Sequence, residues 1–229
     1  SNLSGGTAGI TRTFTGAIVY SSTATGKTVT MNGVTTASFI QFVGVGGGWT
    51  LQDTLNNGSS SFLLSNGTLD TNNQTVTCGN FIASGSATRT LTLGSSTINS
   101  AGSPNLGGTN MTFNVGTSTI NMTGATVIFT GGSRTYNVLT FNNTNIAIND
   151  VNTFATLTVN TGATKLGSVT FGGNQTITGT FTCNGNSVTN RVLICSSVTG
   201  TARTITAATV AITNADLRDL TGAGAGSWN

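Results

Sequence analysis

Triplets in which one threonine separates two apolar residues recur from residue 29 to residue 183, and they constrain the fold more than any other feature. They lie at residues 29–31, 76–78, 91–93, 111–113, 139–141, 157–159, 169–171 and 181–183. A period of two places the apolar residues on one face of a β-strand and the threonines on the other. Threonine is also β-branched and suits the pleated surface of a sheet. The chain is therefore predicted to be all-β.

Short clusters of glycine, asparagine and serine interrupt these strands. They occur at residues 56–58, 65–67, 131–132, 172–174 and 184–185. Glycine and asparagine tolerate the positive φ angles that tight turns require. Signals for helices are almost absent, so strands joined by short turns are expected throughout.

Internal repeats indicate how the strands are arranged. The phrase LGSSTIN at residues 93–99 returns as VGTSTIN at 115–121, and the triplet at 91–93 leads to the one at 111–113. A second motif, a small residue followed by Arg, Thr and an apolar residue, occurs at 11–14, 88–91, 133–136 and 202–205. Repeats of this length cannot bury their own apolar face and must stack. We predict a parallel β-helix, or β-solenoid, with about 20 residues in each complete winding, called a coil below.

A β-sandwich or a meander is the alternative, because the same turn residues also connect hairpins. The triplets that begin at positions 76, 91, 111 and 139 are unevenly spaced. A solenoid with loops of variable length tolerates that spread, so we favour stacking. No segment has the composition of a linker, and residues 1–229 are predicted to form one elongated domain that is part of a longer chain or an assembly.

The scarcity of charge excludes several classes of function. The chain has eight Lys and Arg, five Asp, and no His or Glu. Histidine-based triads and histidine metal sites are thereby excluded. No basic cluster is present that could grip phosphates, and no apolar run is long enough to cross a bilayer. We expect no cofactor, no metal, no nucleic-acid partner and no membrane span.

The aspartates are the main candidates for chemistry. Asp216 and Asp219 form the only close acidic pair, with Arg218 between them. Asp216 and Arg218 share a face of a strand, which favours a local ion pair over a catalytic pair and leaves all three residues as candidates for weak contact with glycans. The remaining aspartates lie in predicted turns, where their carboxylates commonly accept backbone hydrogen bonds: Asp53, Asp70 and Asp150.

Trp49 follows a glycine-rich run at residues 44–48. The run lacks the Lys-Ser/Thr ending of a phosphate-binding loop and no helix is predicted after it. Its glycines are expected to tighten a turn before the strand resumes at Trp49. The indole either packs in the core, which we favour, or is exposed as a platform that contacts glycans.

The three cysteines are an odd number and form no Cys-x-x-Cys motif. Cys78 and Cys183 end apolar-Thr-Cys triplets and Cys195 ends an apolar run. We predict that Cys78 and Cys183 point inward and that all three cysteines are free, buried thiols.

Threonine also recurs at alternate positions, as at residues 28 and 30, 90 and 92, 176 and 178, and 204 and 206. These pairs resemble the flat threonine arrays of ice-binding solenoids. Such an array needs its pairs in register on consecutive coils, and the irregular spacing of the pairs along the sequence weakens the resemblance.

Several longer phrases carry a resemblance to a known group of proteins. They are GWTLQD at 48–53, GTLDTNNQTVT at 67–77, SATRTLTLG at 86–94 and ADLRDL at 215–220. Between about residues 40 and 220 the chain resembles repetitive Thr/Gly/Asn-rich proteins of tailed bacteriophages, notably marine ones. The resemblance implies a β-helical, often trimeric virion component, a fibre, spike or head decoration, on the particle surface or otherwise extracellular, and it implies no catalytic residue.

Three functions are consistent with these observations. The first is a non-enzymatic structural and adhesive virion protein whose hydroxyl and amide side chains make weak, multivalent contacts with host-surface glycans. The second is a bacterial surface adhesin or matrix repeat protein. The third is a polysaccharide depolymerase that uses Asp216 and Asp219. Expected partners are other virion proteins and further copies of this chain, most simply as a homotrimer, because so few charged residues protect the strand edges.

Overall fold

The computed structural model describes residues 16–142, 145–160 and 167–228. Every segment of regular structure in these ranges is a β-strand, and every strand pairing is parallel. The predicted parallel β-solenoid is confirmed, and the sandwich or meander is wrong, because both would pair neighbouring strands antiparallel.

The chain divides into two compact units. Unit 1 comprises Ser1–Ser100 and Asn105–Thr119, and unit 2 comprises Ala101–Pro104 and Ile120–Asn229. That residues 1–229 form one elongated domain remains a prediction.

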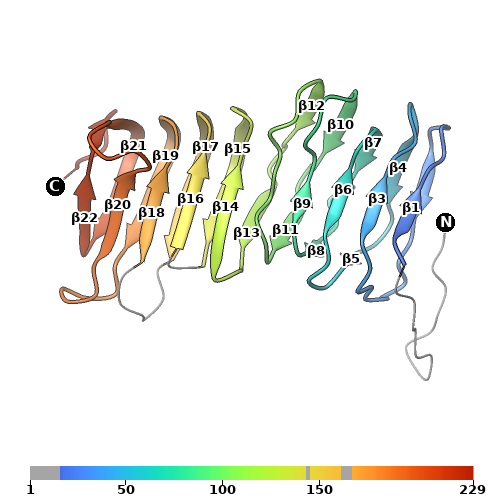
Figure 1. Ribbon diagram of the computed structural model, residues 1–229, viewed down its shortest axis with the longest axis horizontal. Helices are drawn as coiled ribbons and strands as arrows, with labels where there is room; N and C mark the ends of the chain where they lie inside the picture. Colours follow the sequence, from blue (N-terminus) through green and yellow to red (C-terminus); the bar gives the residue numbers. More distant parts are fainter. Residues whose placement is uncertain (1–15, 143–144, 161–166, 229) are drawn as a thin grey trace. The chain divides into compact units, whose positions relative to one another are not determined.

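Unit 1 is built from three ladders of short strands, visible in the blue to green part of Figure 1. The first ladder contains, in order, β1 (Ile18–Tyr20), β3 (Ile40–Phe42), β6 (Phe62–Leu64) and β9 (Phe81–Ile82). The second contains β2 (Lys27–Val29), β4 (Gly48–Leu51), β7 (Gly67–Asp70), β10 (Arg89–Thr92) and β12 (Met111–Asn114). The third contains β5 (Leu55–Asn56), β8 (Val76–Cys78) and β11 (Thr97–Ser100).

Unit 2 is built from two ladders, one of which has much longer strands. The shorter strands, in order, are β14 (Thr126–Thr130), β16 (Asn145–Asn149), β18 (Ser168–Phe171), β20 (Val192–Ser196) and β22 (Ala215–Arg218). The longer ladder contains β13 (Thr119–Met122), β15 (Thr135–Phe141), β17 (Asn152–Asn160), β19 (Gln175–Asn184), β21 (Arg203–Thr213) and β23 (Leu220–Ala223). Strand β13 begins at the last residue of unit 1.

The register of unit 1 gives the length of its coils. Arg89 pairs with Gly67 on one side and Met111 on the other, so these coils advance the residue number by 22. Elsewhere in unit 1 the advance is as short as 19, between Phe62 and Phe81. Leu91 pairs with Phe113 rather than with Met111. The predicted equivalence of the triplets at 91–93 and 111–113 is therefore wrong, because the true partner lies two positions further along. Coils of unit 2 are less regular: residue 135 pairs with 153, whereas residue 175 pairs with 205.

The core consists of the apolar partners of the threonine triplets, which are buried with one exception. Phe113 is only half-buried. Aromatic rings form columns across successive coils: Tyr20 stacks on Phe42 with centroids 4.6 Å apart, and Phe62 stacks on Phe81 at 5.1 Å. Such stacks add to the stability that comes from burial of the rings.

All three cysteines are free and buried, as predicted, and Cys78 and Cys183 lie in this core. Burial disfavours the thiolate, so it raises the pKa of Cys78 and of Cys183 to about 12. Cys195 is also buried. The cysteines therefore serve as small apolar residues rather than as reactive thiols.

Several bends between strands use residues in the left-handed conformation. Of the predicted clusters, those at 56–58, 65–67 and 131–132 each contain a glycine with a positive φ angle, whereas those at 172–174 and 184–185 contain no residue with one. Other such residues lie outside the predicted clusters. Asn72, Gly94 and Gly116 have φ angles of 49°, 56° and 58°, and each follows the previous one by one coil. Asn73 links two of these bends, because its Oδ1 accepts a hydrogen bond from the amide of Ser95 at 2.8 Å. Side chains of one coil thus fix the bend of the next.

Aspartate side chains also hold bends, by accepting hydrogen bonds from backbone amides. The Asp53 carboxylate accepts hydrogen bonds from the amides of Met31 and Asn32, at 2.7 and 2.6 Å. Asp150 accepts one from the amide of Gly132 at 2.7 Å. The predicted turn role is confirmed, but these partners belong to the preceding coil rather than to the aspartate's own turn. Asp70 instead holds its own bend, through the amide of Asn72 at 2.7 Å.

The Arg-Thr motif marks the beginning of strands. Arg89 and Arg203 are the first residues of β10 and β21, and Arg134 directly precedes β15. Arg89 is 1% exposed, and its guanidinium donates to the carbonyls of Ser84, Gly85 and Thr109. This arginine therefore ties two loops together. The copy of the motif at 11–14 lies outside the described residues.

Candidate functional site

Trp49 lies in the core of unit 1. It is 3% exposed, and its ring meets that of Phe42 edge-on at 5.1 Å. The glycines before it allow this packing: a Cβ at Gly47 would lie 2.8 Å from the indole, and one at Gly44 would lie 1.9 Å from the carbonyl oxygen of Ser22. The core position of Trp49 and the structural role of the glycine run are confirmed. With its ring faces covered, the exposed platform proposed as the alternative is wrong.

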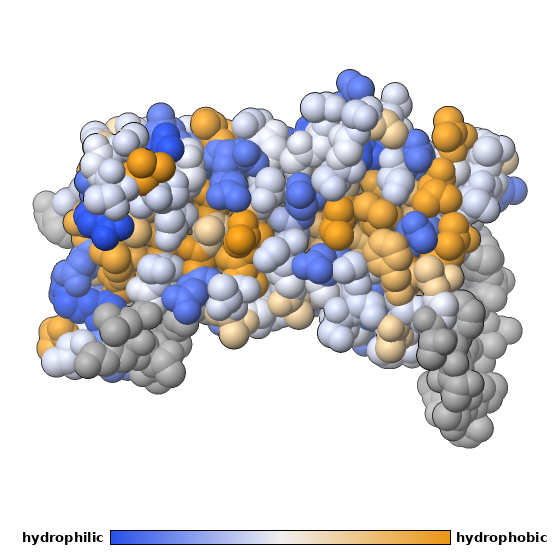
Figure 2. All heavy atoms as spheres, viewed as in Figure 1, coloured by the Kyte–Doolittle hydropathy of each residue, from blue (hydrophilic) through white to orange (hydrophobic). Residues whose placement is uncertain are grey.

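The other candidate residues lie together in the last coil of unit 2. Asp216 and Arg218 are on β22, and Asp219 is in the bend that leads to β23. Arg191, which sequence analysis did not single out, directly precedes β20 in the preceding coil. In a chain with so few charges, this coil is the main concentration of exposed charge among the described residues. Figure 2 shows how sparse strongly hydrophilic side chains are on one face of the molecule.

The ion pairs in this coil differ from the predicted one. Asp216 pairs with Arg191, with Nε and Oδ1 2.8 Å apart, and Arg191 also donates to the carbonyl of Ala215. Arg218 lies instead 3.6 Å from Asp219. The predicted pair of Asp216 with Arg218 is wrong, because adjacent strands are only about 4.8 Å apart whereas alternate residues on one strand are about 6.6 Å apart.

Asp219 is held as a structural residue of its bend. Its φ angle is 53°, and its Oδ2 accepts a hydrogen bond from the amide of Gly200 at 3.1 Å. Together with the Arg191 contact, this means that both carboxylates of the predicted acidic pair already have partners. Neither lines the cavity described next.

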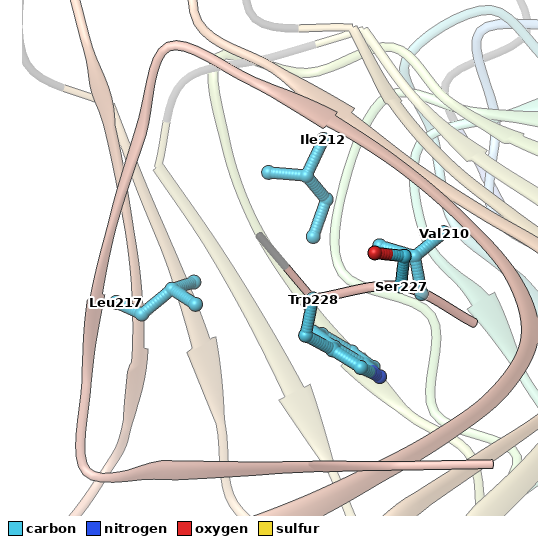
Figure 3. A pocket seen from close by; sticks show the side chains of 5 residues that line it. All are labelled: Val210, Ile212, Leu217, Ser227 and Trp228. Atoms are coloured by element: carbon cyan, nitrogen blue, oxygen red, sulfur yellow. The ribbon is translucent and has the colours of Figure 1, made fainter. Parts of the chain in front are cut away.

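A pocket of about 220 Å³ opens beside these charges, at the end of the core of unit 2 (Figure 3). Its lining residues are Val210, Ile212, Leu217, Ser227 and Trp228. Three of them continue core columns, because Val210, Ile212 and Leu217 pair with the buried residues Phe181, Cys183 and Ile194 of the preceding coil. Leu217 is nevertheless 49% exposed. The pocket is thus a part of the core that the last coil leaves partly open.

Trp228 forms one wall of this pocket and points into the last coil (Figure 3). Its indole lies 6.1 Å from the ring of Phe181, and its Nε1 donates to the carbonyl of Ala223 at 3.3 Å. Glycine is required around it: a Cβ at Gly222 would lie 2.5 Å from the indole, and one at Gly226 would lie 2.5 Å from Val210. The segment from 222 to 228 is therefore a cap over the end of the core.

Sequence reasoning missed Trp228. The signal was the alternation of glycine and alanine at residues 222–226 immediately before the only other tryptophan of the chain. Alternating residues without side-chain bulk allow a backbone to approach a large ring closely. The same combination of glycines and indole occurs around Trp49.

A second hollow, of about 350 Å³, lies in unit 1. Asn66, Thr68 and Thr90 give it polar walls, and the exposed side chain of Val45 stands at its side. Arg89 also lines it, with the guanidinium held by backbone carbonyls. This hollow combines polar hydroxyls with one apolar side chain and has no half-exposed ring.

No group of three or more potential metal-ligating residues occurs in the part of the chain that the structure describes. Among residues 16–142, 145–160 and 167–228 there is also no helix long and apolar enough to cross a membrane.

Comparison of the chain with protein-family models, curated proteins and solved structures found no match. The resemblance to phage proteins therefore stays a prediction.

Proposed function

We propose that this chain is a non-enzymatic structural and adhesive protein, a fibre, spike or decoration component of a virion that contacts glycans on the host surface. Three properties support the proposal. The β-solenoid is compatible with a projecting element, the exterior is rich in hydroxyl and amide groups, and the last coil holds a pocket with Trp228 as one wall. The pocket beside Trp228 is the observation that carries the adhesive part.

The chemistry of the last coil suits a sugar residue. Binding sites for small ligands are mostly apolar, with a few polar groups that fix orientation. Trp228, Val210 and Leu217 supply the apolar wall, and the hydroxyl of Ser227 is the polar group in the lining. Arg191 and Asp216, whose side chains are 40% and 61% exposed, do not line the pocket, so they would contact only a part of the glycan that extends beyond it.

Affinity at one such pocket is expected to be low, because its volume is below the roughly 300 Å³ at which ligand pockets usually begin. Several copies on one particle would raise the overall avidity without any new contact. The proposed homotrimer, bound to other virion proteins, would supply that multivalency.

The test is binding of the multimerised full chain to immobilised envelope polysaccharide of candidate hosts. Trp228→Ala should abolish binding, whereas Trp49→Phe, a conservative change in the buried core, should leave it intact. Binding that survives Trp228→Ala in a folded protein would remove the pocket from the proposal. If the parent chain binds none of the polysaccharides, adhesion fails while the structural role stands. Labelling of particles with an antibody to the chain tests the location separately.

A further inference from the structure

The outer face of the long ladder in unit 2 carries threonines in register on consecutive coils. Strand β17 presents Thr156 and Thr158, and β19 presents Thr180 and Thr182. Thr158 pairs with Thr182. Thr156 and Thr180 directly precede Leu157 and Phe181, which are paired with each other and buried. The two strands therefore place two Thr-x-Thr pairs side by side, a match that their separation in the sequence conceals.

The flanking strands extend this array. On β15, Val138 pairs with Thr156 and Thr140 pairs with Thr158. On β21, Thr209 pairs with Thr180 and Ala211 pairs with Thr182. The four strands thus carry two ranks, that is, rows of side chains that run across the strands. Six of the eight side chains in these ranks are threonine, and the others are Val138 and Ala211. None of the eight is buried.

Two outer ranks flank this array, and register shifts in the pairings of β17 with β19 and of β19 with β21 interrupt the regular spacing on one side. One consists of threonine alone: Thr135, Thr153, Thr176 and Thr206 are paired in succession. On the other side, Asn160 and Asn184 are paired, and side-chain hydrogen bonds of 2.9 Å run along the rank, from Asn160 to Asn142 and from Thr213 to Asn184. These bonds fix the edge of the array.

The central hydroxyls are available to an external partner. The structure shows no hydrogen bond from the side chains of Thr156, Thr158, Thr180 and Thr182 to any described residue. Their β-branched side chains lose little rotamer freedom when they bind, since χ1 is already restricted on a strand. No position in the four ranks is charged or aromatic. The face is neutral, repetitive in two directions and rigid.

We infer that this face binds ice. Strands about 4.8 Å apart and alternate residues about 6.6 Å apart give the hydroxyls a two-dimensional repeat, and both spacings are close to oxygen repeats of hexagonal ice. A neutral water crystal matches the absence of charge, and the threonine methyls and Val138 exclude disordered water between the ranks. A glycan chain repeats in one direction only, whereas this face repeats in two.

This inference uses residues distinct from the pocket at Trp228 and does not depend on the proposed glycan contact. The test is adsorption of the fluorescently labelled full chain to a growing ice crystal, together with inhibition of ice recrystallisation. Thr182→Lys and, separately, Thr158→Lys place a charge within the two central ranks. Each should lose adsorption and inhibition. Thr170→Lys, on the outer face of β18 in the other ladder of unit 2, should retain both.

Circular dichroism and melting select the variants that fold, and the two separate lysine variants keep the test open if one does not. Parent protein that neither adsorbs to ice nor slows recrystallisation would overturn the inference. So would equal activity of the folded Thr182→Lys and Thr170→Lys variants. Binding of this face to polysaccharide but not to ice, detected with the same variants, would replace ice by a glycan as the ligand.

Discussion

The indole of Trp228 packs against Phe181, with ring centroids 6.1 Å apart, and covers part of the core that the last coil of unit 2 leaves open. Val210 and Ile212 continue the core columns of Phe181 and Cys183, and their apolar side chains line the pocket. The glycine-rich segment 222–228 covers part of this surface, and the pocket is the space that it does not fill.

Removal of this cap should destabilise unit 2. Trp228→Ala is expected to lower the free energy of unfolding by about 2 kcal/mol, since a fully buried aromatic costs about 3–5 kcal/mol and Trp228 is half-buried. Trp49→Ala, at a position 3% exposed, should cost about 4 kcal/mol. Urea unfolding followed by circular dichroism measures both. Equal losses at the two positions would contradict the partial burial of Trp228.

A methyl group at residue 222 should displace the cap. The Cβ of Gly222→Ala would lie 2.5 Å from the indole of Trp228, so the ring must move. We expect a loss of about 1–3 kcal/mol, as for overpacking elsewhere, and greater quenching of Trp228 by acrylamide in a Trp49→Phe background. Ala225→Ser, at an exposed residue of the same segment, is the matched control and should change neither quantity.

Aspartates with backbone partners should matter more than the exposed ion pair. Asp53→Ala removes two short hydrogen bonds to the preceding coil, and charged hydrogen bonds contribute about 1.5–3 kcal/mol. Asp216→Ala breaks only the surface contact with Arg191, for which less than about 1 kcal/mol is expected. Chemical denaturation of the two variants under one set of conditions makes the comparison. A larger loss for Asp216→Ala would show that its ion pair is structural.

Stability should fall as the pH rises above about 9. The pKa of Cys78 and of Cys183 is about 12 in the folded chain against 9.0 for an unburied thiol. Between these values the unfolded chain releases thiol protons that the folded chain keeps, so unfolding is increasingly favoured. The stabilisation is complete below pH 9 and is lost as the pH approaches 12. Thermal melts from pH 8 to 10 test this, and Cys78→Ala with Cys183→Ala should flatten the dependence.

Association into a homotrimer is the remaining prediction. Edge strands without charged side chains invite pairing unless symmetry closes them off. Lys27, on the edge strand β2, is one of only two lysines, and Lys165 lies outside the described residues. Sedimentation of the full chain should give a trimer. A sharp monomer that persists at high concentration and unfolds cooperatively would refute it.

The sequence alone determined which residues face the core and where the chain bends. Alternation of apolar residues with threonine is a local property, because successive side chains of a strand point to opposite faces whatever the strand pairs with. The positive φ angles at Asn72 and Gly94 are equally local, since few residue types tolerate them. Parallel stacking of the strands could be predicted because the sequence of residues 93–99 recurs closely at 115–121, one coil later.

Only the tertiary structure decided what lies beside what. Loops between paired strands in unit 2 vary, so the distance in sequence no longer gives the register, and the alignment of Thr158 with Thr182 could not be read from spacing. The partner of Asp216 is Arg191 for the same reason: a neighbouring coil is closer than the next residue on the same face. Burial of Trp49 and partial exposure of Trp228 depend on whether another coil packs over the ring, and no local pattern contains that information.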